Sequence, residues 1–293
     1  MQSIETTDGI GLNVEEVGEG TTIVFVHEFG GNQLSWEPQV RYFSRRYRCV
    51  TFNARGYPPS EVPKEIEFYS QSRAAADIRD VLDGLGIERA HIVGLSMGGF
   101  AALHFGLEFP SRAKSLVVAG AGYGAEKEFE EFFRTNSIEV ANQFEAQGSE
   151  AYSLVYGMAA SRIPFLTKDP RGWEEFRRLL ATHSPSGAAN TMRGVQATRP
   201  SLYDLEDELK VMSVPTLIVV GDEDDHCLQP GLFMKRVIPA SGLAVLPKTG
   251  HTINLEEPTL FNDLIAEFLA QVEQERWGTR DPRSDPSQIM KIN

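Results

Sequence analysis

Short apolar segments alternate with longer amphipathic segments along most of this chain. Each apolar segment has about the length of one buried strand, and a helix-like stretch usually separates it from the next. The predicted strands are 22–26, 49–52, 91–93, 116–119, 216–220 and 243–246. The predicted helices are 34–43, 72–85, 97–109, 230–237 and 258–274. Such alternation is typical of a mostly parallel sheet covered on both faces, so the predicted fold class is α/β with a doubly wound sheet.

The strand signal is absent over 122–210. This segment has helical patches that are rich in aromatic residues, and Pro164, Pro170 and Pro185 interrupt it. We interpret it as a helical lid inserted into a body made of 1–121 and 211–275, with most of its aromatic side chains packed on that body and a few lining a pocket. The stretch 276–293 is polar and rich in proline, so we predict a C-terminal tail.

Charge and cysteine content narrow the range of partners and compartments. The chain has 28 Lys and Arg against 41 Asp and Glu, a formal net charge of −13, which opposes nonspecific attraction to nucleic acid or anionic lipid. Two cysteines are too few for a disulfide framework, and the first residues do not resemble a secretion signal. No apolar run approaches ~20 residues. We therefore expect a cytoplasmic protein that binds neither nucleic acid nor a membrane.

The most informative motif is Gly94-Leu95-Ser96-Met97-Gly98, which lies between a predicted strand and a predicted helix. Small residues on both sides of the serine allow a tight turn that exposes its hydroxyl group. A serine hydroxyl needs a base within hydrogen-bond reach and an acid to orient that base. Ser96 is therefore the candidate nucleophile.

A candidate acid and a candidate base follow later predicted strands. The acidic run 222–225 comes directly after one strand, and His251 follows the last. Because ligands of parallel sheets bind at the carboxyl ends of the strands, these groups are expected near Ser96. Among the other histidines, His226 is the rival base, but it lies only two residues from Asp224, which is awkward for bridging that acid and a distant serine.

At these residues the chain resembles the α/β-hydrolase fold family, from about residue 22 to about residue 269. The matching pieces, in the family's order, are 25–31, 53–56, 94–99, 221–224 and 250–251. In the family pattern a Gly, two variable residues and then Asp follow the strand, so the resemblance selects Asp224 as the acid, with Asp222 and Asp225 as rivals. Two positions depart from the pattern: Glu28 replaces a usual Gly, and Asn53 replaces a usual Asp.

The resemblance also implies where the oxyanion of an acyl transfer would be held. It assigns this role to the backbone N–H groups of Phe29 and Met97. His27 and Glu28 are candidate pocket residues. His27 is expected to fix the loop rather than to act as a second base. A carboxylate at Glu28 would oppose a nearby oxyanion unless it turns away, is protonated or binds a cation, so both a structural and a catalytic or substrate-binding role stay open.

The predicted activity is that of a serine hydrolase acting through an acyl-enzyme on a small carboxylic ester, thioester or lactone. The chain has no phosphate-binding loop, no zinc spacing and no calcium loop, so no cofactor or metal is expected. Three alternatives use the same triad: a C–C bond hydrolase, a cofactor-free lyase and a perhydrolase. A fourth is a slow-turnover ligand sensor with a partner protein. The sequence does not choose a natural substrate, because the lid has no recognisable motif.

Overall fold

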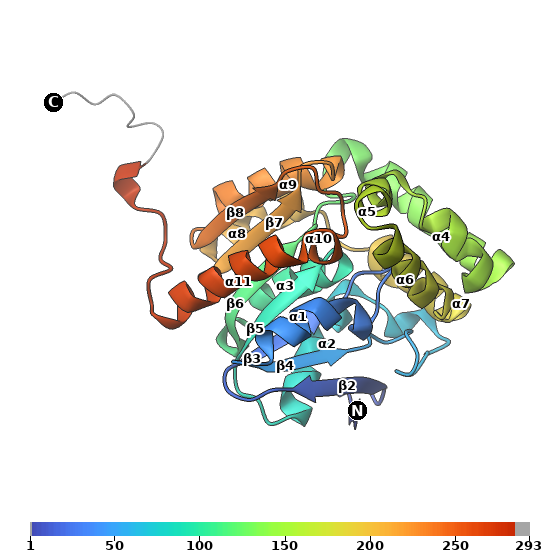
Figure 1. Ribbon diagram of the computed structural model, residues 1–293, viewed down its shortest axis with the longest axis horizontal. Coiled ribbons are helices and arrows are strands. Elements are labelled where there is room, and N and C mark those ends of the chain that lie inside the picture. The colour runs from blue at the N-terminus through green and yellow to red at the C-terminus, as the bar shows by residue number, and fades with distance from the viewer. Residues whose placement is uncertain (1, 285–293) are drawn as a thin grey trace.

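The computed structural model describes residues 2–284, and within them eight strands form one sheet (Figure 1). The strands lie in the order β1-β2-β4-β3-β5-β6-β7-β8. Their bounds are β1 Gln2–Glu5, β2 Gly11–Val17, β3 Thr22–Val26, β4 Arg48–Phe52, β5 Ala90–Leu95, β6 Ala113–Ala119, β7 Thr216–Gly221 and β8 Ser241–Leu246. From β4 to β8 all neighbouring strands are parallel. The predicted mostly parallel sheet is confirmed.

The first two strands are antiparallel and were not predicted from the sequence. In β2 only Leu12 and Val14 point into the core, while polar residues alternate with them. This alternation is typical of a strand with one buried face, whereas the prediction rested on continuous apolar runs.

Helices connect the strands and also fill the long segment between β6 and β7. The α-helices are α1 Glu37–Phe43, α2 Gln71–Gly84, α3 Met97–Glu108, α4 Lys127–Tyr156, α5 Ile163–Lys168, α6 Pro170–Ala181, α7 Pro185–Thr191, α8 Glu206–Val211, α9 Asp225–Val237, α10 Ile253–Glu256 and α11 Pro258–Glu273. Short 3₁₀ or π turns are η1 Gln33–Trp36, η2 Ile66–Phe68, η3 Pro110–Arg112, η4 Ala160–Arg162, η5 Met192–Gln196, η6 Leu202–Leu205 and η7 Pro282–Ser284. The helix predicted over 230–237 begins earlier, at Asp225, because Pro230 is tolerated inside it.

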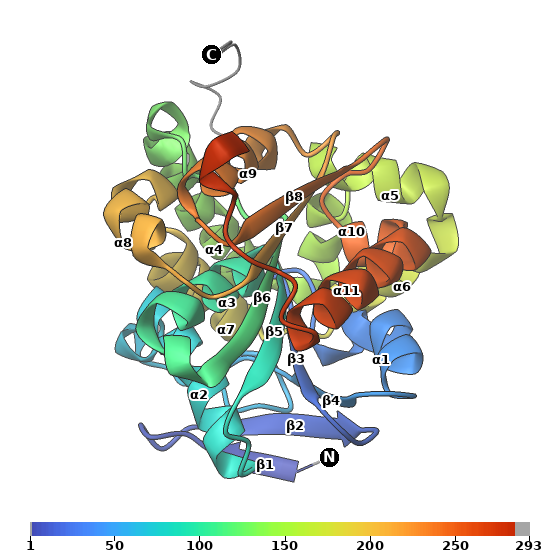
Figure 2. The ribbon, with the colours of Figure 1, turned by 90° about the vertical axis from the view of Figure 1, so that its left-hand side faces the viewer.

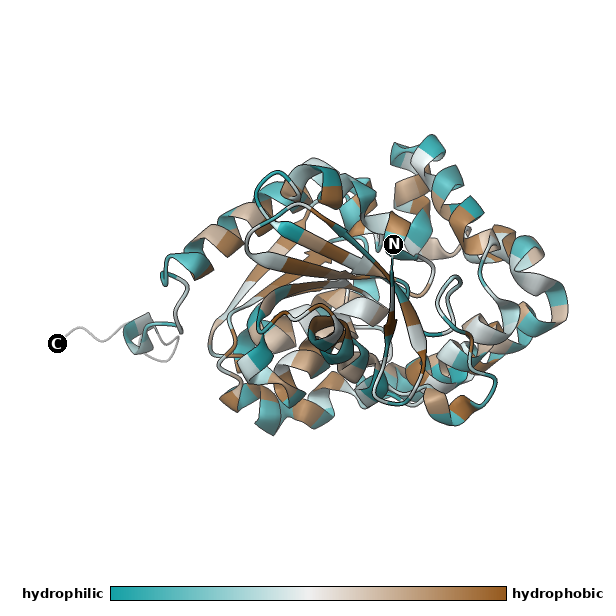
Figure 3. Ribbon diagram, turned by 90° about the horizontal axis from the view of Figure 1, so that it is seen from below, coloured by the Kyte–Doolittle hydropathy of each residue, from teal (hydrophilic) through white to brown (hydrophobic). Residues whose placement is uncertain are grey.

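Two hydrophobic cores lie on opposite faces of the sheet. Helices α1 and α11 cover one face, where Trp36, Phe43 and Phe261 pack on β3, β5 and β7. Helices α2, α3, α8 and α9 cover the other face, as Figure 2 shows. Figure 3 shows the strands as a mainly hydrophobic band between these two layers. A sheet buried on both faces explains why its strands appear in the sequence as apolar runs.

The segment between β6 and β7 forms a separate group of helices, α4 to α7, on one side of the molecule (Figure 1). Helix α4 kinks at Gly148, whose φ of 78° interrupts the helical backbone. A third apolar cluster joins this group to the body through Phe29, Tyr57 and Met97 on the body and Phe144 and Leu180 on the helices. These helices therefore pack directly on the loops that follow β3 and β5.

The C-terminal end of the described chain packs against the edge strand β8. The indole N–H of Trp277 donates a hydrogen bond of 2.9 Å to the carbonyl oxygen of Ala240, and the ring lies 4.6 Å from that of Phe268. The rest of the predicted tail, residues 285–293, lies outside the described residues. Among residues 2–284, no helix is both long and apolar enough to span a membrane.

Candidate active site

Ser96 lies at the turn between β5 and α3, in a strained backbone conformation. Its φ of 55° and ψ of −115° are rare for a residue with a side chain, and such strain is common at functional positions. The flanking glycines are sterically required. A Cβ atom at Gly94 would lie 2.0 Å from the carbonyl oxygen of Gly98, and one at Gly98 would lie 2.0 Å from that of Val26. The turn therefore tolerates only glycine at both places.

His251 and Asp224 are in direct contact. The Nδ1 atom of His251 lies 2.7 Å from Oδ2 of Asp224, and both side chains are buried. Burial by itself would raise the pKa of the Asp224 carboxyl, but the charge of His251 and its hydrogen bond outweigh burial and lower that pKa. Asp224 is therefore ionised at neutral pH and orients the imidazole, leaving Nε2 as the ring atom available for chemistry.

Ser96 and His251 line one cavity of about 140 Å³. Asp224 lies behind His251 and does not line it. The remaining wall comes mainly from the helical segment between β6 and β7. The lining residues are Ser96, Tyr123, Phe133, Asn136, Ser137, Val140, Tyr156, Ala159, Ser161, Arg162, Met192, Gln196, Arg199 and His251.

The rival acids and bases lie elsewhere. Asp222 is exposed, and its carboxylate accepts a hydrogen bond from the backbone N–H of Thr249, while Asp225 is exposed at the start of α9. His226 packs edge-on against Phe129 in a different hollow. His91 contacts Ser115 inside the sheet. None of them lines the cavity of Ser96.

The two candidate oxyanion donors, Phe29 and Met97, are buried on either side of this region. Within residues 2–284, neither backbone N–H donates a hydrogen bond to a protein group. The N–H of Met97 is free because it belongs to the first turn of α3, where donors have no partner within the helix. Neither residue is among those that line the cavity of Ser96, so their assignment as donors rests on the resemblance and on these unbonded N–H groups.

His27 fixes the loop after β3. Its Nε2 atom accepts a hydrogen bond of 3.0 Å from the N–H of Ala54, so Nδ1 carries the proton and donates to the carbonyl oxygen of Glu28 at 2.7 Å. Burial lowers the pKa of His27 to about 4. Both ring nitrogens are occupied, and the side chain does not line the cavity.

Glu28 is buried behind the cavity and paired with Arg162 of η4. The two guanidinium Nη atoms of Arg162 each contact one oxygen of the Glu28 carboxylate, one of them at 3.0 Å, and both side chains are 2% exposed. Burial alone would lower the pKa of Arg162, but the charge of Glu28 outweighs it and raises that pKa. Because the carboxylate bonds a cation, its charge is not directed at the oxyanion position.

The same short turn, η4, also contacts the loop that carries His251. Arg162 donates a hydrogen bond of 2.6 Å to the Oγ1 atom of Thr252, and the N–H of His251 donates to the carbonyl oxygen of Ser161 at 3.1 Å. Two residues of the inserted segment, Ser161 and Arg162, therefore connect the loop with Glu28 to the loop with His251. Glu256 fixes the latter loop further by accepting hydrogen bonds from the N–H groups of Gly250 and Thr252.

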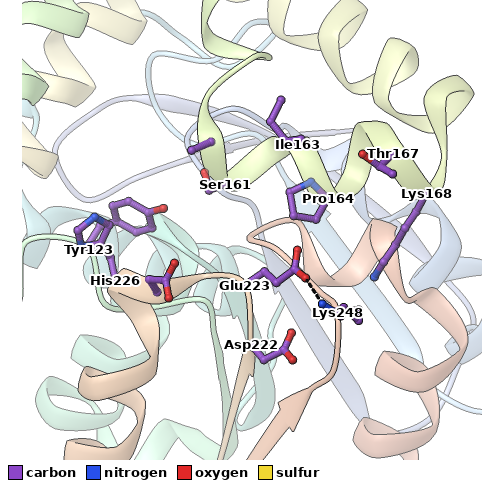
Figure 4. A pocket seen from close by; sticks show the side chains of 12 residues that line it. Tyr123, Ser161, Ile163, Pro164, Thr167, Lys168, Asp222, Glu223, His226 and Lys248 are labelled. Atoms are coloured by element: carbon purple, nitrogen blue, oxygen red, sulfur yellow. Dashed lines mark hydrogen bonds and ion pairs between the residues drawn. The ribbon is translucent and has the colours of Figure 1, made fainter.

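A second hollow lies outside the cavity, between η4–α5 and the loops after β7 and β8 (Figure 4). Its volume is about 700 Å³, and Tyr123 and Ser161 line both this hollow and the cavity of Ser96. The ion pair of Lys248 and Glu223, at 3.1 Å, lies across its floor.

Within the part of the chain that the structure describes, one group of side chains has the spacing of metal ligands. It consists of Asp224, Cys227 and His251, whose ligand atoms lie within 4.8 Å of one another. A metal there would take the Nδ1 atom that Asp224 already binds. The arrangement is accounted for by the histidine and carboxylate pair.

Sequence reasoning missed Arg162, Tyr123 and Arg199 as residues of this cavity. The unusual Glu28 indicated that a cation could be its partner, but the partner lies 134 residues later in the chain. Nothing in the sequence of the inserted segment distinguishes Arg162 from its other basic residues.

Comparisons with known proteins identify the family and fold of the chain. A family model described as alpha/beta hydrolase fold matches residues 21–258. The 3-oxoadipate enol-lactonase 1 of Acinetobacter baylyi is 28% identical over 86% of this chain and 89% of its own length. The 2-hydroxy-6-oxo-6-phenylhexa-2,4-dienoate hydrolase of Burkholderia cepacia is 26% identical over 88% of this chain and 91% of its own length. The solved structure of a thermophilic esterase from Thermogutta terrifontis, with malate bound, is 26% identical, covers 92% of this chain and 98% of its own, and superposes with a TM-score of 0.81.

Proposed function

The chain belongs to the alpha/beta hydrolase fold family, and from that premise we propose that this enzyme is a serine hydrolase with a triad of Ser96, His251 and Asp224. The observation that carries the proposal is the contact of 2.7 Å between Asp224 and His251, at the wall of the cavity that Ser96 also lines. The strained turn at Ser96 supports the assignment, because it exposes a single hydroxyl at the end of a buried strand.

The mechanism follows from these positions. His251 takes the proton of the Ser96 hydroxyl at Nε2 while the serine oxygen attacks the acyl carbon of the substrate. Asp224 holds the imidazole in the required tautomer and stabilises its cation. The N–H groups of Phe29 and Met97 donate to the oxyanion, and His251 then protonates the leaving group. Water hydrolyses the acyl-enzyme by the same steps in reverse order.

Glu28 and Arg162 act in this proposal as positioning residues. Their ion pair lies next to Phe29 in the chain and beside Thr252, so it fixes the loop of one oxyanion donor relative to the loop of the base. A shift of about 1 Å in such a group can reduce the rate of an enzyme ~100-fold. This accounts for a carboxylate at a position where resembling sequences usually have glycine.

The segment 122–210 is proposed as a lid that selects substrates. It supplies most of the cavity wall, including Phe133, Val140 and Met192, whereas the body supplies Ser96 and His251. The substrate class that best fits this small cavity is a small carboxylic ester, thioester or lactone. An enol-lactonase and an esterase are among the similar proteins, as is a hydrolase of a dienoate. All of these reactions require the same triad, so the triad does not distinguish them. A panel of esters, lactones and C–C substrates does.

Covalent labelling tests the nucleophile. We expect a fluorophosphonate to add one phosphonyl group to the wild-type enzyme and none to Ser96→Ala, measured by intact mass, because only Ser96 has both the strained turn and the neighbouring base. Hydrolysis of short-chain esters is expected to fall by ~10³-fold or more in the same variant.

Ser137 provides the matched control. It is a buried serine that lines the same cavity as Ser96, but it lies on α4. Ser137→Ala is expected to keep the label. Labelling that persists in Ser96→Ala and disappears in Ser137→Ala would assign the nucleophile to α4 and refute the proposed triad.

A further inference from the structure

Two guanidinium groups line the cavity of Ser96, and their surroundings differ. Arg162 is fully paired with the carboxylate of Glu28, so the two charges cancel. Arg199 lies three residues after η5 and also lines the cavity. Among residues 2–284, no carboxylate forms an ion pair with Arg199. The uncompensated positive charge of the cavity therefore belongs to Arg199.

The side chain of Arg199 is held in place by neutral groups. Its Nη1 atom donates to the amide oxygen of Gln196, and its Nη2 atom donates to the carbonyl oxygen of Tyr123. The ring of Phe100 lies 3.7 Å from the centre of the guanidinium, and the ring of Phe133 lies 4.8 Å from it. A cation close to two aromatic rings is stabilised by them, and these contacts restrain the guanidinium. The charge is thus fixed in position before any ligand arrives.

Arg199 is half-buried, and a partly desolvated guanidinium without an anionic partner is costly, because the lost hydration of the charge is not offset. Burial lowers the pKa of Arg199 to about 9, so the group still carries its charge at neutral pH. Two of the five N–H groups of the guanidinium have protein partners, and the side chain lines the cavity. An anionic ligand would satisfy the remaining donors and offset the charge.

We propose that the substrate of this enzyme carries a carboxylate, which Arg199 binds while the reacting carbonyl group lies at Ser96. This inference rests on the proposed hydrolase function and adds the charge of the substrate to it. The cavity volume of about 140 Å³ is below the ~300–1,000 Å³ of typical pockets for drug-sized ligands. The expected substrate is therefore a short ester or lactone with a carboxylate at the far end of its acyl group.

Matched pairs of esters test the proposal. Monomethyl succinate, glutarate and adipate are compared with methyl butanoate, pentanoate and hexanoate, which have the same chain lengths but end in a methyl group. For at least one length, the wild-type enzyme is expected to hydrolyse the acid ester with a kcat/KM at least ~10-fold higher than that of its neutral partner. A wild-type enzyme that prefers the neutral ester at every length overturns the proposal without any variant.

Substitution then assigns the effect to one residue. Arg199→Met is expected to lower the ratio of the two kcat/KM values by roughly 10- to 100-fold, and Arg199→Lys by less, because a lysine keeps the charge but not the planar donor group. Arg193→Met is the control, since Arg193 lies nearby in η5, pairs with Glu145 and does not line the cavity. An unchanged ratio in both Arg199 variants, or a loss in Arg193→Met instead, contradicts the proposal.

A binding measurement separates this inference from the assignment of the nucleophile. Calorimetry with monomethyl glutarate and methyl pentanoate on Ser96→Ala reports recognition without turnover. Tighter binding of the acid ester, lost in Ser96→Ala/Arg199→Met, supports the carboxylate site even if labelling assigns the nucleophile elsewhere. Equal binding of the two esters refutes the carboxylate site while leaving the triad untouched.

Discussion

The pair of Glu28 and Arg162 illustrates how one substituted residue changes the chemistry of its neighbours. A carboxylate next to an oxyanion donor would oppose the developing negative charge if it were free. Here the guanidinium of Arg162 binds both carboxylate oxygens of Glu28. The pair therefore contributes rigidity between two loops and almost no net charge.

Replacing the carboxylate with an amide should reveal this role. Glu28→Gln is expected to lower kcat by ~10-fold or more while KM changes less, because the loop of Phe29 loses its fixed position. The unpaired Arg162 should also reduce the free energy of unfolding by about 3 kcal/mol. Kinetics across the pH range and urea unfolding measure the two effects.

Asp80→Asn serves as the control for a purely structural loss. Asp80 pairs with Arg73 and Arg79 on α2, away from the cavity, and its side chain is equally buried. The Asp80→Asn substitution should reduce the free energy of unfolding and leave kcat unchanged. If Glu28→Gln behaves in the same way, Glu28 has no part in positioning the catalytic groups.

At the scale of elements, the accuracy of prediction followed the type of burial. Strands β3 to β7 are largely buried on both faces and were recognised as apolar runs, as was the half-buried edge strand β8. The turn at Ser96 was recognised from its two glycines. Strands β1 and β2 were missed because only one face is buried there. The pairing of η4 with the loop of Glu28 was out of reach, since it depends on how α4 to α7 fold back over the body, and no local pattern encodes that path.

Helix α4 contributes the largest share of the proposed lid, and its faces should differ in effect. Val140 is buried and lines the cavity, whereas Leu154 on the same helix is 56% exposed. Val140→Phe is expected to reduce the space for the acyl group, so the ratio of kcat/KM for octanoate to acetate esters should fall ~10-fold or more. Leu154→Phe should leave this ratio unchanged. Equal effects of the two substitutions on chain-length preference would remove α4 from the specificity site.

At the scale of the whole molecule, buried histidines should set the response to acid. Burial lowers the pKa of His27 to about 4 and those of His91 and His183 to about 3, whereas an exposed histidine titrates near 6.5. Below pH ~6.5 the unfolded chain therefore binds protons that the folded chain does not. The free energy of unfolding should fall as the pH drops from 6.5 toward 4, by about 1.4 kcal/mol per pH unit for each of these histidines.

Urea unfolding at pH 7, 6 and 5 measures this dependence. His91→Asn removes one titrating group, and its amide can still bond the hydroxyl of Ser115. Between pH 6 and 5 the free energy of unfolding of this variant should therefore fall less steeply than that of the wild type. The difference in slope corresponds to the uptake of about one proton on unfolding. If the wild-type free energy of unfolding is the same at pH 7 and pH 5, these histidines bind protons equally in the folded and unfolded chains, which contradicts the prediction.

The place at which the helical segment joins the sheet has a consequence for inheritance. Strands β6 and β7 are neighbours, with Leu116 opposite Thr216, so the chain leaves the sheet and returns to it only one strand away. Ser96 is encoded upstream of this excursion, and Asp224 and His251 are encoded downstream. Two recombination events, one after the codons of β6 and one before those of β7, can exchange the whole excursion between genes without dividing either strand. The proposed lid and the residues of the proposed triad can thus be inherited separately within a single reading frame.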